Sequence, residues 1–225
     1  MNMAVIIQAR MNSKRLPNKV LMPINGKPII DYLIEQIKYK NPELPIIVAT
    51  SKNKADIDIV KHCERLNIDV FQGNLENVSS RFFNIMNAKS LTFCVRVCAD
   101  SPLLDGSIIS RLVKLINDKV DIVTNVYPRT FPKGQSVEVI NCKTFISNYN
   151  KLNSKQDFEH VTRYYYNNSK VFNILNLQND KDLSSVNLSI DTEDDYQKVS
   201  KIIYNLDKNH YEYSFKDIIR KYNEY

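Results

Sequence analysis

Short apolar runs alternate with amphipathic, helix-patterned segments through the first 125 residues of this 225-residue chain. Patterns typical of buried strands occur at 3–7, 45–50, 68–71, 92–98 and 121–125. Between them, apolar residues recur at helical spacing at 28–37, 55–66, 76–88 and 107–116. Because repeated strand–helix pairs favour a parallel sheet, we predict an α/β protein with a mostly parallel central sheet and helices on both faces.

A strongly cationic loop follows the first strand. It carries Arg10, Lys14, Arg15 and Lys19. Ligands of open α/β sheets bind at the carboxyl ends of the strands, so this charge predicts an anion site, with a polyphosphate as the obvious candidate. The loop lacks the glycines and the Gly-Lys-Ser/Thr ending of a Walker A loop and the glycine fingerprint of dinucleotide-binding folds. Side chains must therefore hold the phosphates; a solvated basic loop is the alternative interpretation.

The residues of this loop resemble the opening signature of a known family. Ile7-Gln8-Ala9-Arg10-Met11, followed by Ser13, Arg15-Leu16-Pro17 and Lys19-Val20-Leu21, is similar to the start of the sugar-acid cytidylyltransferases, and most similar to the branch named after spore-coat polysaccharide biosynthesis protein F. The resemblance implies a Rossmann-like nucleotide-diphospho-sugar transferase fold. It also implies Mg²⁺-dependent transfer of CMP from CTP to an acidic sugar of the nonulosonic or octulosonic type, with release of pyrophosphate, for surface-glycan biosynthesis.

The resemblance also assigns residues to the nucleotide and to catalysis. Catalytic roles fall to Arg10, Lys19 and Asp100. Nucleotide contacts are expected from Gln8, Ala9, Arg10, Ser13, Arg15, Lys19, Gln72, Gly73 and Arg96. Two of these remain open: Ser13 could instead make a local turn bond, and Arg96, inside an apolar strand, needs a phosphate, a base or a buried carboxylate as its partner.

Two aspartates follow predicted strands far apart in the chain. Asp100 ends the strand at 92–98 and precedes Ser101-Pro102, where capping a turn is the alternative role. Asp191 ends a predicted strand at 187–190, just before Thr192, a good N-cap for a helix at 193–206. The Asp-x-Pro and Ile-Asp-Thr elements resemble the family's metal motifs, so we expect Asp100 and Asp191 to converge beside the cationic loop and bind Mg²⁺.

The strand–helix rhythm changes after Tyr127. Strands are predicted at 136–140 and 171–175, and helices at 142–149 and 158–166. We interpret 127–185 as an insertion within a single domain (1–225) that covers the ligand edge, binds the acceptor and offers a homodimer contact. By resemblance, acceptor contacts fall to Gln135, Glu138, Glu159 and His160. The acceptor carboxylate needs a partner, for which Arg129, Lys133, Gln135 and Arg163 are open alternatives.

Composition excludes several other classes of protein. The net charge of +6 is dispersed among 25 acidic residues, without an aromatic-interleaved basic patch, so no nucleic-acid partner is expected. No apolar stretch approaches the roughly 20 residues that span a bilayer, so we expect no membrane partner either. The four cysteines form no Cys-x-x-Cys pair, which is typical of a reducing, cytoplasmic location. His62 and His210 lie in Lys-rich surroundings and are expected at the surface.

Two neighbouring activities compete with the first interpretation. A cytidylyltransferase could act on a phosphorylated small molecule and give a CDP-linked product. A nucleotide-sugar glycosyltransferase could share a similar fold, but it usually carries an Asp-x-Asp motif after a central strand, which Asp100-Ser101-Pro102 is not.

Overall fold

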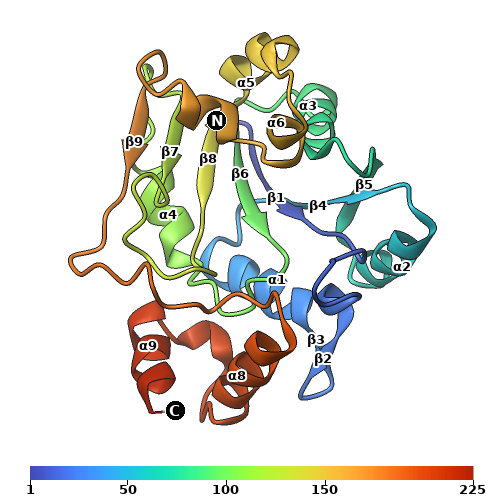
Figure 1. Cartoon of the computed structure of the whole chain (residues 1–225), viewed down its shortest axis with the longest axis vertical. Coiled ribbons are helices and arrows are strands. Elements are labelled where there is room, and N and C mark those ends of the chain that lie inside the picture. Colours follow the sequence, from blue (N-terminus) through green and yellow to red (C-terminus); the bar gives the residue numbers. More distant parts are fainter. Residues whose placement is uncertain (225) are drawn as a thin grey trace.

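A seven-stranded mixed sheet forms the centre of the protein (Figure 1). The computed structural model describes residues 1–224. The strands are β1 (Met3–Gln8), β4 (Ile46–Ser51), β5 (Asp69–Gly73), β6 (Phe93–Cys98), β7 (Ile122–Thr124), β8 (Glu138–Asn141) and β9 (Ile174–Asn176), in the spatial order β5-β4-β1-β6-β8-β7-β9. Only β8 runs antiparallel to its neighbours. The mostly parallel α/β architecture predicted from the sequence is confirmed.

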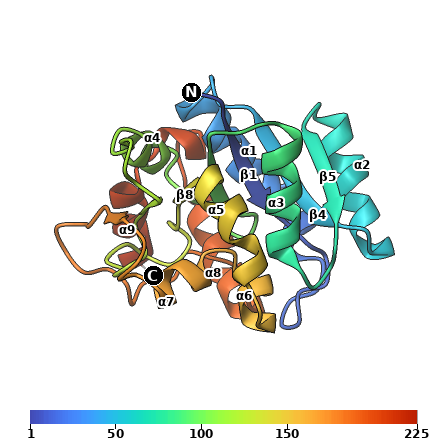
Figure 2. The same ribbon diagram turned by 90° about the horizontal axis from the view of Figure 1, so that it is seen from above.

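Helices cover both faces of this sheet (Figure 2). One face packs against α1 (Ile29–Lys40), α2 (Ile57–Arg65) and α4 (Ser107–Val113), and the other against α3 (Val78–Ala88), α5 (Cys142–Asn148), α6 (Lys155–Glu159) and α7 (Arg163–Asn167). The C-terminal helices α8 (Glu193–Tyr204) and α9 (Phe215–Asn223) lie together at one end of the molecule (Figure 1), where α8 contacts the small hairpin of β2 (Pro23–Ile24) and β3 (Lys27–Pro28). Within residues 1–224, no helix combines the length and the apolar character needed to cross a membrane.

The position of the central strand β1 explains why its residues form a continuous apolar run in the sequence. Val5 and Ile7 point into the core beneath α1, and Ala4 and Ile6 into the core beneath α3, because successive side chains of a strand face opposite ways. All four are essentially inaccessible to solvent. A strand buried on both faces has no polar side to alternate with, as is usual for parallel sheets.

In helix α2, the side chains that face the core differ from those that the sequence pattern predicts. The pattern at 55–66 places Ile57 inward, but Ile57 is 49% exposed, whereas Ile59 and Cys63 are fully buried. A 3₁₀ turn at Lys54–Asp56 precedes the helix and turns Asp56 into the protein interior. Since this turn sets the rotation of the helix, the buried stripe starts two residues later than the sequence pattern suggests.

The helix predicted at 158–166 is divided in two. Helix α6 ends at Glu159, and His160 adopts an extended backbone before α7 begins at Arg163. The break buries Val161 completely and lets the Thr162 hydroxyl reach Glu138 in the sheet. A straight helix would not satisfy both contacts, so tertiary packing overrides the local pattern.

The strand predicted at 187–190 does not form: the segment has an isolated bridge at Asn187 and a bend at Ser189, and it does not join the sheet. Asn187 makes one isolated bridge to Lys133, and the Ile190 amide donates to the Asp100 carbonyl at 2.9 Å. Gly134 allows this close approach: its φ is +87°, and a Cβ there would lie 2.6 Å from the carbonyl carbon of Leu188. The segment's neighbours are loops, which cannot supply a ladder.

Both histidines expected at the surface are largely buried. His210 is 5% exposed and its Nε2 lies 2.8 Å from the Tyr32 carbonyl, while His62 pairs with Asp31 at 2.6 Å. Burial lowers the pKa of His210, only partly offset by its contact with Tyr32. The boundaries of the proposed insertion at 127–185 stay a prediction; within that range β8 lies inside the sheet, between β6 and β7.

Arg81 of α3 is a fully buried cation beside strand β4 of the sheet. Its guanidinium donates to three backbone carbonyls, those of Ala49, Asn74 and Leu75, at 3.0–3.1 Å. Burial lowers its pKa to about 10, with Asp56 acting in the opposite direction. Arg81 therefore joins β4 to the loop that follows β5.

Replacing Arg81 by Met should destabilise the protein strongly. The half-buried Leu75 carbonyl and the Asn74 carbonyl lose a charged donor, and the Ala49 carbonyl keeps only the Ala9 amide. Since a hydrogen bond to a charged group contributes about 1.5–3 kcal/mol, we expect a loss of about 3 kcal/mol in urea unfolding. Arg65→Met, at an exposed position of α2, should stay within about 0.5 kcal/mol of the parent protein. Equal unfolding midpoints for the two variants would contradict the role assigned to Arg81.

Candidate active site

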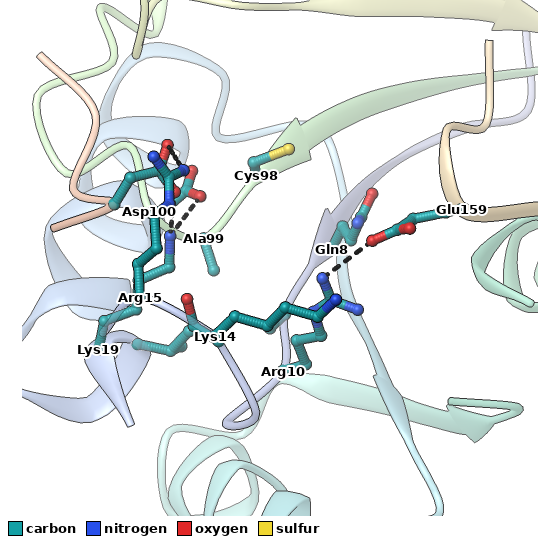
Figure 3. Close-up of a pocket in the computed structure, with 13 residues that line it drawn as sticks. Gln8, Arg10, Lys14, Arg15, Lys19, Cys98, Ala99, Asp100 and Glu159 are labelled. Carbon is teal, nitrogen blue, oxygen red and sulfur yellow. Dashed lines mark hydrogen bonds and ion pairs between the residues drawn. The ribbon is translucent and has the colours of Figure 1, made fainter. Parts of the chain in front are cut away.

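A polar cavity of about 300 Å³ opens at the carboxyl ends of β1 and β6 (Figure 3). Its walls are formed by Gln8, Ala9, Arg10, Ser13, Lys14, Arg15, Lys19, Val20, Cys98, Ala99, Asp100, Glu159 and Asp191. The loop after β1 thus lines the cavity as predicted. Lys19 and Asp100 lie toward one end, and Arg10 and Glu159 toward the other (Figure 3).

At the end of the cavity where Asp100 lies, Lys19 links the β1 loop to two distant segments, those of Asp100 and of Ile190–Asp191. Its ammonium group donates to Asp100 Oδ2 at 2.8 Å, Asp191 Oδ1 at 2.8 Å and the Ile190 carbonyl at 2.6 Å. All three of its protons are used, and the side chain is only 8% exposed. Burial lowers the pKa of Lys19, but the two carboxylates outweigh burial and raise it overall. Lys19 therefore stays a cation, and the two aspartates converge on it.

Local sequence explains how Lys19 reaches this position. Asn18 adopts a left-handed conformation with φ +63°, one that asparagine tolerates, and a 3₁₀ turn at Lys19–Leu21 follows. Val20 is buried in the core and anchors that turn, while Lys19 points into the cavity.

Asp56 supports the start of the loop from beneath. It is completely buried and accepts hydrogen bonds from the Met11 amide at 2.7 Å and from the amide and hydroxyl of Ser51. Sequence reasoning missed this residue, because an aspartate at the start of a predicted amphipathic helix is typical of a solvated first turn. A carboxylate that fixes the loop's backbone keeps the loop's cations in place.

The two aspartates form a donor set that fits Mg²⁺. Asp100 Oδ2 and Asp191 Oδ1 each lie 2.8 Å from Lys19 Nζ, so the two carboxylates flank one position, which the ammonium group fills in this structure. Mg²⁺ binds oxygen at roughly 2.1 Å and commonly takes one or two carboxylates plus substrate phosphates and waters. No cluster of three or more possible metal-ligating side chains occurs within residues 1–224.

Two further ion pairs hold the remaining arginines of the loop. Arg15 lies 3.1 Å from Asp191 Oδ2, and Arg10 lies 3.1 Å from Glu159 Oε1. Both arginines are at least one-third exposed, so these pairs are weak and can exchange for a stronger anion. A phosphate group accepts bidentate hydrogen bonds from arginine and is such an anion.

Arg96 finds the buried carboxylate that the sequence left as one of three options. It pairs with Glu138 of β8 and donates to Gln8 Oε1 at 2.9 Å. Glu138 is 4% exposed and also accepts from the hydroxyls of Thr162 and Tyr166. Burial raises the pKa of Glu138, but Arg96 and the two hydroxyls lower it below its usual value overall.

Several predicted site residues lie away from the cavity. Gln72 and Gly73 line a separate hollow of about 510 Å³ beside the β5–α3 loop, and His160 is exposed outside the cavity. Gln135 is fully buried, where its side chain receives the Asp105 amide and donates to the Leu103 carbonyl. Of the predicted acceptor residues, Glu159 alone lines the cavity. The ligand roles of all these residues stay predictions.

This fold and cation-lined cavity agree with the family comparison. The chain matches the cytidylyltransferase family over residues 4–221, and it belongs to that family. It is 28% identical over 205 residues to the spore coat polysaccharide biosynthesis protein SpsF of Bacillus subtilis, covering 88% of this chain and 84% of that protein. Family membership favours a cytidylyltransferase over the glycosyltransferase alternative.

Solved structures show the same architecture. A cytidylyltransferase from Leptospira borgpetersenii serovar Hardjo-bovis superposes with a TM-score of 0.94 at 25% identity, covering 100% of this chain and 94% of that one. A CMP:2-keto-3-deoxy-manno-octonic acid synthetase, solved in complex with CTP, superposes with a TM-score of 0.70 at 16% identity, covering 91% and 99%. At that lower identity the likeness concerns the fold alone.

Glu138→Gln should remove a pH-dependent part of the stability. Because the folded-state pKa of Glu138 lies below its ordinary value of 4.5, the unfolded chain takes up the proton first as pH falls. The contribution of Glu138 is thus complete above pH 4.5 and is lost toward lower pH. We expect the variant to be about 3–5 kcal/mol less stable at pH 7, with a smaller gap at pH 3.5, in urea unfolding.

Glu43→Gln is the matched control, since Glu43 is exposed. Its unfolding curves should follow those of the parent protein at both pH values. A gap between Glu138→Gln and parent that is the same at pH 7 and pH 3.5 would contradict the ion pair.

Proposed function

We propose that the protein transfers CMP from CTP to an acidic sugar of the nonulosonic or octulosonic type and releases pyrophosphate, for the synthesis of a surface glycan. The observation that carries this proposal is Lys19 held between Asp100 and Asp191 in a cavity that also presents Arg10, Lys14 and Arg15. Two acids and four cations suit phosphoryl-type transfer, in which the protein mainly positions groups and compensates charge.

The reaction joins an acceptor hydroxyl oxygen to the α-phosphorus of CTP and breaks the bond from that phosphorus to the bridging oxygen. Pyrophosphate leaves and the hydroxyl proton passes to solvent. Arg10 and Arg15 would exchange their ion pairs for the phosphates. Lys19, released from Asp100 and Asp191 when these hold the metal, would help to neutralise the charge that develops on the leaving group. Mg²⁺, held by Asp100 and Asp191, would supply Lewis-acid activation of the phosphate and the attacking hydroxyl.

The comparisons support this assignment in two respects. The synthetase of similar fold was solved with CTP, and the Bacillus subtilis relative is named for polysaccharide biosynthesis. A CDP-linked product from a phosphorylated acceptor remains the alternative within the same family. The four cysteines are free thiols, which suits a reducing cytoplasm, and segment 127–185 would provide a homodimer contact.

Pyrophosphate release with each of the four NTPs, a panel of acidic sugars and a panel of phosphorylated alcohols tests the proposal. We expect release with CTP, Mg²⁺ and one acidic sugar, abolished by EDTA and reduced about 10²- to 10³-fold in Asp100→Asn. Mass spectrometry then separates CMP-linked from CDP-linked products. Release with phosphorylated acceptors alone would refute the acidic-sugar assignment, and consumption of a nucleotide sugar with release of NDP would refute the transferase assignment.

Replacing Lys19 by Met tests two separate effects of this lysine, one on kcat and one on the melting temperature. Losing one charged contact to the transferring phosphates should lower kcat about 10²- to 10³-fold. The same change leaves Asp100 and Asp191 facing each other without their cation, and added Mg²⁺ should then raise the melting temperature of the variant more than that of the parent. Lys38→Met, at an exposed position of α1, is the control for a lost charge. An unchanged kcat in Lys19→Met would exclude this lysine from the reaction.

A further inference from the structure

Arg129 is a cation close to the cavity for which the structure provides no counter-ion. It follows β7, and because β7 runs parallel to β6, it lies at the same edge of the sheet as Cys98 and Asp100. Its guanidinium is half-buried and donates through Nη1 to Ser136 Oγ at 3.0 Å and to the Pro132 carbonyl at 3.5 Å. Within residues 1–224 it has no ion pair, and its Nε and Nη2 atoms make no hydrogen bond.

The charges around Arg129 do not balance. In the described part of the chain, the carboxylate that acts on it is Glu138, which is already engaged by Arg96, Thr162 and Tyr166. Two guanidiniums therefore share one carboxylate, and one positive charge is left over. Burial lowers the pKa of Arg129, and nearby Glu138, Tyr166 and Cys98 oppose this effect. Glu138 pairs with Arg96, which donates to Gln8 in the cavity wall, so the surplus charge belongs to a cluster that adjoins the cavity.

The other residues that the sequence offered for the acceptor's charged group are less suitable. The Gln135 side chain is buried and saturated by Asp105 and Leu103. Arg163 pairs with Asp157 at 3.7 Å. Lys133 is exposed to solvent, whereas Arg129 is half-buried, although neither of the two lines the cavity itself. Arg129 alone among the four combines partial burial, an uncompensated charge and proximity to a cavity residue.

We propose that Arg129 binds the carboxylate of the acceptor and thereby selects an acidic sugar, an inference that rests on the proposed function. In the cyclic form of a 2-keto sugar acid, the carboxylate is attached to the anomeric carbon, which also carries the attacking hydroxyl. A fixed guanidinium beyond Cys98 would place that hydroxyl toward Asp100 while the cations of the β1 loop hold the triphosphate. The guanidinium fork matches a planar carboxylate through two parallel hydrogen bonds.

An aromatic pair adjoins this position and suits a sugar ring. Tyr127, two residues before Arg129, stacks on Tyr166 with ring centroids 4.7 Å apart and an interplanar angle of 8°. Tyr127 is 40% exposed, so its ring is available to an incoming ligand. Tyr166 in turn bonds to Glu138, which fixes the pair relative to the sheet.

Binding measurements test the proposal without requiring turnover. The probes are 3-deoxy-manno-octulosonate, N-acetylneuraminate, the methyl ester of each, and glycerol 3-phosphate, added to protein with CTP and Ca²⁺ and followed by ligand-observed NMR and calorimetry. The proteins are the parent chain, Arg129→Gln, Arg129→Lys and the neighbouring Lys133→Gln as matched control, each checked by its melting temperature.

We expect one sugar acid to bind the parent protein and Lys133→Gln equally, and Arg129→Gln about 10- to 150-fold more weakly. Arg129→Lys, which keeps the charge and loses the fork, should recover only part of this loss. The methyl ester should bind the parent protein as weakly as the acid binds Arg129→Gln. In steady-state assays the KM for the acid should rise in Arg129→Gln while the KM for CTP stays the same.

Three results would overturn the proposal: equal binding of the acid by Arg129→Gln and parent, a loss in Lys133→Gln instead, or Arg129-dependent binding of glycerol 3-phosphate rather than of any sugar acid. Binding of neither acid by the parent protein also counts against it. If an acid binds through Arg129 but CTP yields no pyrophosphate, the carboxylate subsite stands and the proposed function fails.

Discussion

The ammonium group of Lys19 is the contact on which the active-site geometry depends. It draws Asp100, from the end of β6, and Asp191, from the segment before α8, to the loop that follows β1. Without a cation between them, two carboxylates at this separation would repel each other in a partly buried site. The lysine thus lets the folded chain assemble an acidic pair before any ligand binds. Under the proposed function, the same side chain would both assemble the site and compensate charge during the reaction.

A second electrostatic cluster lies further along the same edge of the sheet. Arg96 and Glu138 are opposite one another in the register of β6 and β8, at the end of an otherwise apolar face. Burying one such charge alone is costly, but a hydrogen-bonded pair inside a sheet is tolerated. The antiparallel strand β8 makes this possible, because it places the start of a strand, rather than its end, beside the carboxyl edge of β6.

Much of the architecture could be predicted from the sequence. The strand–helix alternation of the first 125 residues depends on local periodicity, and the convergence of the β1 loop with Asp100 follows from the rule that parallel strands end at one edge. The resemblance to a family supplied Asp191, for which local patterns give only the helix cap at Thr192. That cap is observed, with Asp195 completing a capping box.

The remaining features depend on contacts that no local pattern records. Asp56 looks like a solvated first-turn acid until the loop above it is folded. Gln135 looks available for a ligand until its backbone partners at Leu103 and Asp105 are in place. The break between α6 and α7 exists because Val161 must enter the core. The sequence around each of these residues gives no indication of its role, because that role depends on contacts that form only in the folded protein.

The positions of the candidate site residues along the chain have an evolutionary consequence. Lys19, Asp100 and Asp191 all lie outside the segment 127–185, whereas Arg129, Glu138 and Glu159 all lie inside it. If the proposed roles are assigned in this way, changes confined to that segment would alter acceptor recognition and leave the groups proposed for the triphosphate unchanged. Such a scaffold would be modular, and related proteins could diverge in acceptor without rebuilding the site for the nucleotide.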